Sequence, residues 1–400
     1  MSKPGTPALA LETKAVMTYT DGLKAHRPLS IPVQHAVNFQ CATSPQLGEG
    51  FRNGSPFVYQ RFGHPTSQAA AEKIALLEGG EAGLVFGSGM GAISTGLMAL
   101  AGVSGSHVIA QRDIFAQTYS FLHEVMRGLG VKTTFFDMQD MDGLRRLIQP
   151  ETKLIYIESP SNPLITITDI ASVSAVAKEH NILVMIDSTF ASPYLQNPLQ
   201  LGADLVLHSG TKFLGGHSDV MCGVAAGSAS LIRRVAEMQI MLGTVLDPNA
   251  AWLLLRGIKT LGVRVQRQSD TALAIASLLQ AHPSVANVYY PFLESSPYHH
   301  IAKKQMKAGG GMLSFEFKSG KRGADAFVEA LEVISIATSL GGVESIIEIP
   351  KDLDFSEEEL GTPASESRVP AGLIRLSVGI EDPGDLLRDV EQALNAAAKA

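Results

Sequence analysis

The sequence predicts an α/β protein with a large domain built on a mostly parallel sheet covered by helices, followed by a smaller C-terminal α+β domain. Three observations predict it. The chain has 400 residues, which is more than a single hydrophobic core usually serves. Hydrophobic residues make up 45% and charged residues 18%, as in a protein with a large buried core. Beyond about residue 66, short apolar runs alternate with helical stretches, and this pattern changes in the last third of the chain.

Residues 1–58 come before the alternating pattern. They lack a strong hydrophobic period and carry turn formers such as Pro28, Pro32 and Asn53-Gly54. We therefore expect an extended N-terminal arm. Its apolar residues, among them Val37 and Phe39, predict that the arm packs on another surface.

Residues 59–255 form the predicted large domain. Its expected helices are 66–78, 89–100, 115–129, 140–148, 169–180 and 230–240. Its expected strands are Gly83–Phe86, His107–Ala110, Lys132–Phe136, Leu154–Glu158, Ile182–Asp187 and Asp204–His208. Continuous apolar strands alternating with helices favour a parallel sheet that is buried on both faces.

Residues 256–400 form the predicted C-terminal α+β domain. A helix-rich connection at 249–281 leads into it, and Met312–Lys318 alternates like a half-exposed strand. A helix is expected at 323–332, a strand at Leu373–Val378 and a closing helix at 382–398. The acidic and then Gly/Pro/Ser-rich stretch 351–369 predicts a surface loop.

Charge and composition exclude several classes of function. The formal charge is −7 and no basic block occurs, so we expect neither nucleic acid nor an anionic membrane as partner. Cys41 and Cys222 are too few for a disulfide framework and lack metal-ligand spacing, which predicts no metal and a reducing compartment. Residues 1–10 lack the apolar core of a signal peptide, and no apolar run is long enough to span a bilayer. We therefore expect a cytoplasmic protein.

A glycine-rich turn follows the first expected strand and opens a helix, in the order Gly87-Ser88-Gly89-Met90-Gly91-Ala92. Small residues let backbone N–H groups at a helix N-terminus reach a phosphate. The same letters satisfy the dinucleotide fingerprint G-x-G-x-x-A, with Asp113 as a candidate ribose ligand. The turn alone leaves both readings open, together with a turn that only packs helix on strand.

Asp187 and Lys212 follow two further strands and should lie at the same sheet edge as the glycine turn. A carboxylate there can keep a pyridinium nitrogen protonated, and a lysine of lowered pKa can form a Schiff base. Ser209 and Thr211 flank the lysine with hydroxyl groups suited to the same phosphate. Together these residues favour a pyridoxal 5'-phosphate (PLP) site.

Six ordered motifs extend this pattern over nearly the whole chain. They are Tyr59-Gln60-Arg61-Phe62-Gly63-His64-Pro65-Thr66, Ser88-Gly89-Met90, Glu158-Ser159-Pro160-Ser161-Asn162-Pro163, the stretch 187–223 with Ser209-Gly210-Thr211-Lys212 and Gly216-His217-Ser218-Asp219-Val220, residues 339–345 and residues 374–381. With them the sequence resembles the Cys/Met-metabolism family of PLP enzymes. That family includes cystathionine γ-synthase, cystathionine lyases, methionine γ-lyase and O-acylhomoserine sulfhydrylases. The resemblance implies an aspartate-aminotransferase-like fold.

The resemblance also implies roles for the cofactor site. Lys212 would form the Schiff base and move protons between substrate carbons, and Asp187 would hold the pyridine nitrogen. The phosphate would be bound by Gly89, Met90, Ser209 and Thr211. Lys212, Phe115 and Tyr59 occupy the positions implied to be catalytic, and Phe115 would also stack on the cofactor ring.

Two further implications concern the substrate and the assembly. Asn162, Ser339 and Arg375 would anchor the carboxylate of an amino-acid substrate, for which a bidentate arginine is suited. Tyr59 and Arg61 would reach the phosphate of a neighbouring subunit, and the N-terminal arm 1–58 would contact that subunit. The resemblance thus implies a dimer with shared sites and a homotetramer.

Three positions depart from the family pattern. Phe115 stands where a tyrosine is usual, so stacking is kept but the phenol that can donate a proton is lost. Thr338 stands where enzymes that handle cystathionine commonly carry a glutamate for the distal ammonium, so it belongs to the substrate pocket but disfavours cystathionine. His64 replaces a frequent asparagine, which leaves it either a loop residue or a residue of the pocket.

The sequence leaves the reaction open. Phe115 favours γ-replacement on an O-acylhomoserine, whereas the Gly216–Asp219 stretch favours γ-elimination from methionine or cystathionine. The preference between β and γ carbons is also open. A dinucleotide-dependent oxidoreductase would leave Lys212 and Asp187 unexplained, and a catalytically silent relative would not need them.

Overall fold

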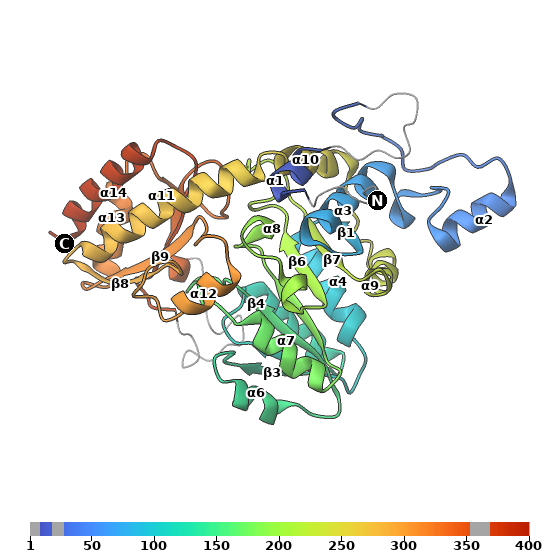
Figure 1. Ribbon diagram of the computed structural model, residues 1–400, viewed down its shortest axis with the longest axis horizontal. Helices are drawn as coiled ribbons and strands as arrows, with labels where there is room; N and C mark the ends of the chain where they lie inside the picture. The colour runs from blue at the N-terminus through green and yellow to red at the C-terminus, as the bar shows by residue number, and fades with distance from the viewer. Residues whose placement is uncertain (1–8, 18–27, 353–368, 400) are drawn as a thin grey trace.

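A computed structural model describes residues 9–17, 28–352 and 369–399 of the chain. Within them the larger sheet has seven strands in the order β1-β7-β6-β5-β4-β2-β3. The strands are β1 (Ala82–Phe86), β2 (His107–Gln111), β3 (Lys132–Phe136), β4 (Thr152–Glu158), β5 (Leu183–Asp187), β6 (Leu205–Ser209) and β7 (Gly223–Gly227). Strand β7 alone runs opposite to the other strands of this sheet. The predicted mostly parallel sheet is therefore confirmed (Figure 1).

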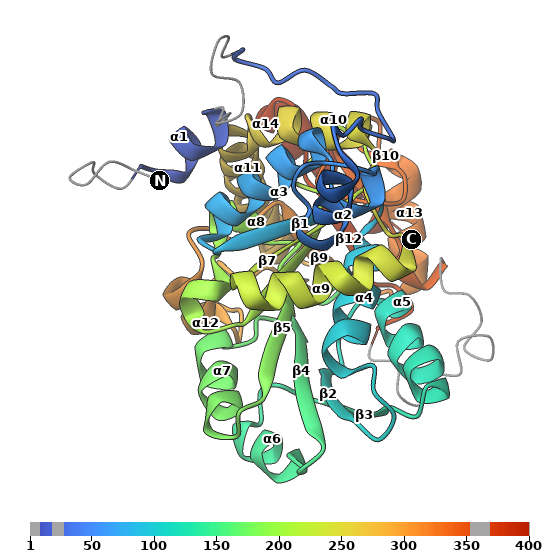
Figure 2. The ribbon, with the colours of Figure 1, turned by 90° about the vertical axis from the view of Figure 1, so that its right-hand side faces the viewer.

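Helices bury both faces of this sheet. One face packs on α3 (Pro65–Glu78), α7 (Ile170–Glu179), α8 (Ser192–Leu195) and α10 (Pro248–Ile258). The other packs on α4 (Gly89–Ala101), α5 (Ala116–Ser120), the π-helical turn η2 (Phe121–Met126) and α9 (Ala229–Leu242), which crosses in front of the strands in Figure 2. Along β4, Leu154 and Tyr156 enter the second core while Ile155 and Ile157 enter the first, as expected of a strand buried on both faces.

Helix starts follow the capping signals in the sequence. Ser88 caps α4 by accepting a hydrogen bond from the Gly91 N–H at 2.9 Å, and Asp169 caps α7 in the same way. Pro65 is the first residue of α3, directly after the N-cap His64, whose Nδ1 accepts from the Thr66 N–H. Two shorter elements, α6 (Met141–Leu147) and η3 (Pro198–Leu201), complete the crossovers between strands. The helix expected at 115–129 is interrupted by η2.

The sequence does not predict β7, because its residues Gly-Val-Ala-Ala-Gly have little strand preference. The structure gives a reason for small residues there. A Cβ on Gly223 would lie 2.1 Å from the Ser88 carbonyl oxygen, so β7 must be nearly bare where the glycine turn crosses it.

A second sheet of five strands lies in the C-terminal part, at the left of Figure 1. Its order is β10 (Ser335–Ile336), β11 (Ile346–Glu348), β12 (Ile374–Ser377), β9 (Met312–Phe317) and β8 (Val285–Tyr289). Helices α11 (Leu261–Ala281), α13 (Lys321–Ala330) and α14 (Pro383–Ala397) pack on it, and α12 (His299–Gln305) lies nearer the large sheet. The predicted smaller α+β unit is confirmed.

The expectation of a half-exposed strand at Met312–Lys318 is wrong. Residues Met312 to Phe315 are at most 2% exposed, because β9 lies between β12 and β8 and both of its faces are covered. Phe315 faces the C-terminal core, whereas the Ser314 hydroxyl donates to the Pro163 carbonyl oxygen of the large domain at 2.7 Å. Alternation of polar and apolar residues there reflects two different buried faces.

The N-terminal region is not extended throughout. It contains α1 (Leu11–Val16) and α2 (Ser44–Asn53), followed by the short turn η1 (Gln60–Phe62). Lys73 of α3 donates to main-chain carbonyls at the end of α1, and Trp252 donates to the Ile31 carbonyl oxygen at 3.1 Å. In Figure 1, α2 lies at the far right, away from the C-terminal sheet. The domain limits at residues 58 and 255 stay a prediction.

Two expectations concern other segments. Residues 353–368 of the predicted surface loop lie outside the described residues, and Pro350–Asp352 form the short turn η4 before them. Among the helices that the structure describes, we find none that combines the length and the apolar character needed to span a bilayer.

Candidate active site

The polar residues that follow the parallel strands meet at one edge of the large sheet. Glu158 and Asp187 are register partners at the ends of β4 and β5, and Asp187 pairs with Leu207 of β6. Ser209 ends β6 opposite Gly223. Parallel strands place their carboxyl ends together, so the order β6-β5-β4 dictates this cluster.

The glycine turn and Ser209 form one end of the site. A Cβ on Gly89 would lie 2.8 Å from the Ser209 Cβ and 2.9 Å from its Oγ, so only glycine lets the turn approach this closely. Gly89 and Met90 occupy the first turn of α4, where backbone N–H groups have no partner within the helix. These donors and the Ser209 hydroxyl suit an anion.

Thr211 lies beside this turn, but its hydroxyl is engaged. Its Oγ1 donates to the Cys222 carbonyl oxygen at 3.2 Å and accepts from the Cys222 N–H at 3.0 Å. The hydroxyl thereby fixes the start of β7. Its predicted role in phosphate binding requires this donor to be exchanged and stays a prediction.

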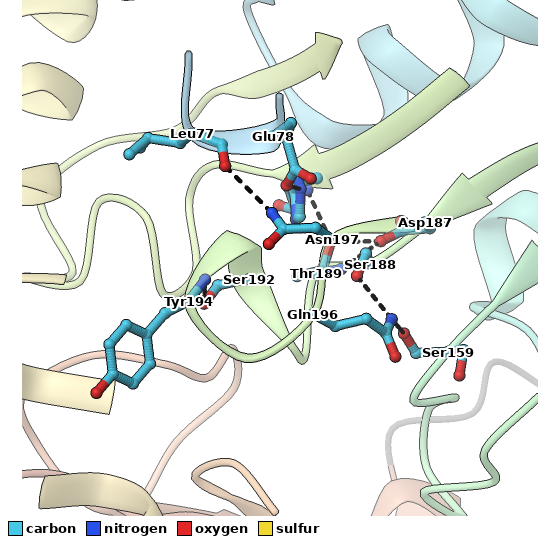
Figure 3. A network of polar contacts seen from close by, with 12 residues as sticks. Leu77, Glu78, Ser159, Asp187, Ser188, Thr189, Ser192, Tyr194, Gln196 and Asn197 are labelled. Carbon is cyan, nitrogen blue, oxygen red and sulfur yellow. Dashed lines mark hydrogen bonds and ion pairs between the residues drawn. The ribbon is translucent and has the colours of Figure 1, made fainter. Parts of the chain in front are cut away.

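Asp187 lies at the centre of the edge and is 6% exposed. Burial raises the pKa of its carboxyl group, and hydrogen bonds from Thr189 oppose this rise. Asp187 Oδ1 accepts from both the N–H and the Oγ1 of Thr189, and Thr189 Oγ1 in turn accepts from the Ser209 N–H at 2.8 Å. Figure 3 shows Asp187 beside Thr189 in a polar network. A buried carboxylate held in this way suits a protonated ring nitrogen.

Polar contacts among buried residues also hold this edge of the sheet in place. Gln196 Nε2 donates to the Ser159 carbonyl oxygen at 3.1 Å and to Ser188 Oγ at 3.2 Å, which ties the ends of β4 and β5 together (Figure 3). His208 Nε2 lies 2.5 Å from Glu78 Oε1, and both side chains are almost fully buried. The edge is therefore fixed before any ligand binds.

Lys212 has an amine suited to imine chemistry. Burial and the nearby Arg375 lower the pKa of its amine to about 8, although Glu348 acts in the opposite direction. Its Nζ donates to Ser339 Oγ at 2.6 Å, although the two residues are 127 positions apart. A larger fraction of this amine is neutral near pH 7 than in an ordinary lysine.

Arg375, Asn162 and Ser339 come together as predicted. Arg375 is 7% exposed on β12, and its Nη1 donates to Asn162 Oδ1 at 2.9 Å while its Nη2 donates to the Ser339 carbonyl oxygen at 3.0 Å. Glu348 of β11 lies 2.7 Å from the same guanidinium. Ser339 has a φ of 79°, which is uncommon outside glycine and fits a residue held in place by both Lys212 and Arg375.

Phe115 and Thr338 border this cluster. Phe115 is the N-cap of α5 and is 37% exposed, and its N–H donates to Glu158 Oε2 at 2.9 Å. Thr338 is exposed and adjoins Ser339. Ring stacking by Phe115 and substrate contact by Thr338 stay predictions.

Tyr59 and Arg61 are not brought to the site within one chain. Arg61 Nη1 donates to the Ile240 carbonyl oxygen at 3.2 Å near the end of α9, and its guanidinium lies 5.5 Å from the centre of the Tyr59 ring. Among the described residues, no hydrogen bond or ring contact joins either of them to Lys212 or Asp187.

Three site residues were not assigned a role from the sequence. Thr189 holds Asp187, Glu158 holds the neighbouring loops, and Glu348 pairs with Arg375. Thr189 had a local signal, because a threonine two residues after a strand-end aspartate can donate to it. Glu158 and Glu348 had none, because the partners of Glu158 lie on two loops and that of Glu348 lies on another strand.

Two other readings of the sequence are excluded or left without support. In a dinucleotide-binding fold the strand before the glycine turn is central and parallel to its neighbours, but β1 is an edge strand paired only with antiparallel β7. His64 caps α3 and packs on Phe39, so a role in the pocket gains no support. Within the described residues no group of three or more His, Cys, Asp or Glu side chains is arranged to hold a metal ion.

The arrangement fits PLP. A glycine turn that a Cβ would close, a buried carboxylate held by Thr189 and an amine of lowered pKa stand along one sheet edge. These are the groups that bind a phosphate, hold a pyridinium nitrogen and form an imine. The fold and the site together define a PLP-dependent enzyme with a large α/β domain.

Comparisons with known proteins agree. The profile described as "Cys/Met metabolism PLP-dependent enzyme" matches residues 12–395. A cystathionine beta-lyase from Lactococcus lactis subsp. cremoris is 42% identical over 392 residues, which cover 96% of this chain and 99% of the relative. An L-methionine gamma-lyase from Pseudomonas deceptionensis is 41% identical over 391 residues, covering 96% and 97%. The crystal structure of cystathionine gamma-lyase from Lactobacillus plantarum complexed with L-serine superposes with a TM-score of 0.90 at 37% identity, covering 98% of this chain and 100% of that one.

The chain therefore belongs to the Cys/Met-metabolism family of PLP-dependent enzymes. It is an enzyme of the lyase or transferase type in sulfur amino-acid metabolism, with PLP as cofactor and an amino acid as substrate. The family resemblance, the fold class and the cofactor predicted from the sequence are confirmed.

Proposed function

We propose that the protein is a carbon–sulfur lyase that cleaves the Cγ–S bond of a thioether amino acid whose side chain is uncharged. The products are a thiol, a 2-oxoacid and ammonia, with one water consumed. Relatives named as lyases of cystathionine and of L-methionine support elimination. Exposed, uncharged Thr338 supports a substrate without a distal ammonium, because it provides no carboxylate to meet one.

The observation that carries the proposal is the contact of Lys212 Nζ with Ser339 Oγ at 2.6 Å, beside the Arg375 guanidinium. An amino acid whose carboxylate pairs with Arg375 would present its α-carbon toward Lys212. Asn162 Oδ1 holds one arm of the guanidinium and Glu348 the other, so Arg375 is oriented before substrate arrives.

When bound, PLP supplies an aldehyde that joins an amine and a protonated ring that accepts electron density from the substrate. The chain's own residues do the rest. Asp187 keeps the ring nitrogen protonated, with Thr189 orienting its carboxylate. Lys212 Nζ takes the proton from the substrate Cα and returns it to a carbon further along the side chain. Its lowered pKa suits both directions of transfer near neutral pH.

A second candidate is γ-replacement on an O-acylhomoserine, and one observation favours it. Position 115 is a phenylalanine, so it has no hydroxyl that could protonate a departing thiolate. A carboxylate leaving group needs no such proton, because it is a weaker base than a thiolate.

A substrate panel separates the two candidates. The purified protein would be incubated with L-methionine, cystathionine, O-acetylhomoserine and O-succinylhomoserine, each with and without an added thiol. The lyase proposal predicts 2-oxobutanoate and ammonia from methionine at a rate that the thiol does not reduce. Turnover of only the O-acyl substrates, with a thioether amino acid as product, would contradict it and support replacement.

We also propose a homodimer with shared sites that pairs into a tetramer. In the part of the chain that the structure describes, no hydrogen bond or ring contact joins Tyr59 or Arg61 to Lys212 or Asp187, which supports their contribution to a neighbouring site. Helix α2, which precedes these two residues, projects from the large domain (Figure 1). A cytoplasmic location stays our prediction, and it is supported by the unpaired state of Cys41 and Cys222.

A further inference from the structure

Glu158 has an unusual position among the buried residues of the site. It ends β4 in register with Asp187 of β5, so two carboxylates lie side by side, and Glu158 is only 5% exposed. Burial of a charged group is unfavourable unless hydrogen bonds compensate for the lost water. A carboxylate retained here next to another carboxylate therefore needs an explanation beyond packing.

Two hydrogen bonds compensate, and they come from different loops. Glu158 Oε2 accepts from the Phe115 N–H at 2.9 Å, on the loop between β2 and α5. Its Oε1 accepts from the Asn162 N–H at 2.9 Å, on the loop after β4. Each oxygen thus holds one loop. Burial and the neighbouring Asp187 raise the pKa of Glu158 well above its usual range, and these two hydrogen bonds oppose the rise only in part.

The two loops carry different parts of the site. Phe115 is the residue proposed to stack on the cofactor ring. Asn162 accepts from Arg375 through Oδ1 at 2.9 Å and so belongs to the proposed carboxylate anchor. Glu158 is therefore the link between the ring-stacking position and the substrate anchor.

A carboxylate is the side chain that this link requires. Two N–H donors converge on it from opposite loops, and only a carboxylate offers an acceptor oxygen to both. A glutamine keeps one acceptor but turns an NH₂ group toward the other N–H. One loop would then lose its acceptor, and its N–H would face another donor.

We propose that Glu158 is a positioning residue that holds the Phe115 loop and the Asn162 loop in one fixed arrangement, so that the stacked cofactor and the substrate carboxylate are recognised together. The inference rests on the roles of Phe115 and Asn162 under the proposed function. It does not depend on whether elimination or replacement follows.

The main test uses ligand binding without turnover. L-Norleucine carries no leaving group on Cβ or Cγ, and n-pentylamine is the same molecule without its carboxylate. Both would be titrated into the cofactor-loaded protein and followed by visible absorbance. In Glu158→Gln we expect the Kd of norleucine to rise about tenfold, as for loss of one buried hydrogen bond, and the Kd of pentylamine to stay within about twofold.

Two comparisons make the result specific. Asn162→Ala should reproduce the loss of norleucine affinity. The double variant should bind norleucine about as weakly as either single variant, because both changes break the same path. Thr152→Val is the matched control. It removes a buried hydroxyl at the start of β4, which bonds to His107 Nδ1 at 2.8 Å and to the Gln149 N–H at 2.9 Å, and neither partner lies on the Phe115 or Asn162 loop. We expect it to leave both ligands within about twofold.

Equal weakening of norleucine and pentylamine in Glu158→Gln, or no weakening of either, would overturn the proposal. Should Glu158→Gln fail to retain cofactor, hydrogen exchange of the cofactor-free proteins gives the decision. Faster exchange of the Phe115 and Asn162 amides in Glu158→Gln, but not in Thr152→Val, supports the proposal, and unchanged exchange overturns it. Neither measurement needs turnover, so a failed lyase assay would leave the outcome intact.

Discussion

Lys212 lies among groups that set its proton affinity from opposite sides. Burial and the Arg375 guanidinium favour the neutral amine, and the Glu348 carboxylate favours the ammonium form. The pKa of about 8 that results leaves the amine more reactive than a surface lysine at neutral pH, because only the neutral amine attacks an aldehyde.

The first prediction concerns pH. In the cofactor-free protein, the rate of PLP attachment should rise about tenfold per pH unit up to about pH 8 and then level off, because the neutral fraction of Lys212 follows this course. Absorbance of the bound cofactor after rapid mixing measures it.

Substitutions at the two charged neighbours give opposite signs. Arg375→Gln removes a cation and should move the midpoint upward, whereas Glu348→Gln removes an anion and should move it downward. A midpoint near 10 in the unaltered protein, or shifts in the same direction, would contradict the assigned environment.

The second prediction concerns Thr189, which joins Asp187 to Ser209. Thr189→Val removes the hydroxyl that donates to Asp187 and accepts from the Ser209 N–H. We expect the Kd of PLP to rise about tenfold, because one buried donor and one buried acceptor lose their partner. Thr189→Ser keeps the hydroxyl and should stay within about threefold of the unaltered protein. Equal losses in the two variants would assign the effect to packing.

At this scale, the sequence was informative where function is concentrated in a motif. Lys212, Asp187, Asn162, Ser339 and Arg375 were all named from ordered motifs, and the structure brings the last three together with Lys212. Glu348 shows what such motifs omit. It is a register partner of Arg375 across two strands, and only the pairing of β11 with β12 reveals it.

Among the elements, the start of α4 places the site's requirement for a small residue at Gly89. The backbone of Gly89 contacts Ser209 so closely that a methyl group has no room. The close approach brings the N–H groups of the helix start and the Ser209 hydroxyl to one place, which suits a phosphate.

The third prediction follows from this contact. Gly89→Ala should push Ser209 aside and weaken PLP binding about 100-fold, because donors to a doubly charged phosphate are displaced. Gly128→Ala is the control, since a Cβ there meets open space and alanine favours the helix. Titration of both cofactor-free variants with PLP measures the effect. Unaltered binding in Gly89→Ala would show that the phosphate lies elsewhere.

Elements with a long apolar period were predictable, and those shaped by their neighbours were not. Strands β4 and β5 stood out as continuous buried runs. Strand β7 did not, because contact with the glycine turn requires small residues in place of β-branched ones. The buried second face of β9 was missed because it is covered by the other domain, which no local pattern indicates.

For the whole molecule, the open question is how the site is completed. Arg61 is exposed and bonded to the end of α9, and it makes no described contact with the Lys212 cluster of its own chain. A C₂ dimer would solve this, because each chain would give its Tyr59 and Arg61 to the other and both sites would be complete.

The fourth prediction tests this by mixing two inactive variants. Lys212→Ala lacks the amine, and Arg61→Ala lacks the guanidinium group that would reach the neighbouring site. If sites are shared, a mixed dimer has one intact site, and random reassembly should restore about a quarter of the unaltered activity. If each chain completes its own site, the mixture should show no more activity than the two variants assayed separately.

The central claim is that Lys212 carries the cofactor. The most direct measurement is to treat the purified protein with borohydride, digest it and locate the cofactor by peptide mass spectrometry. We predict a visible absorption band near ~420 nm that borohydride removes, with the reduced cofactor attached to the peptide that contains Lys212. We also predict that Lys212→Ala folds normally but is inactive. Attachment at a different lysine, or full activity in Lys212→Ala, would contradict the account.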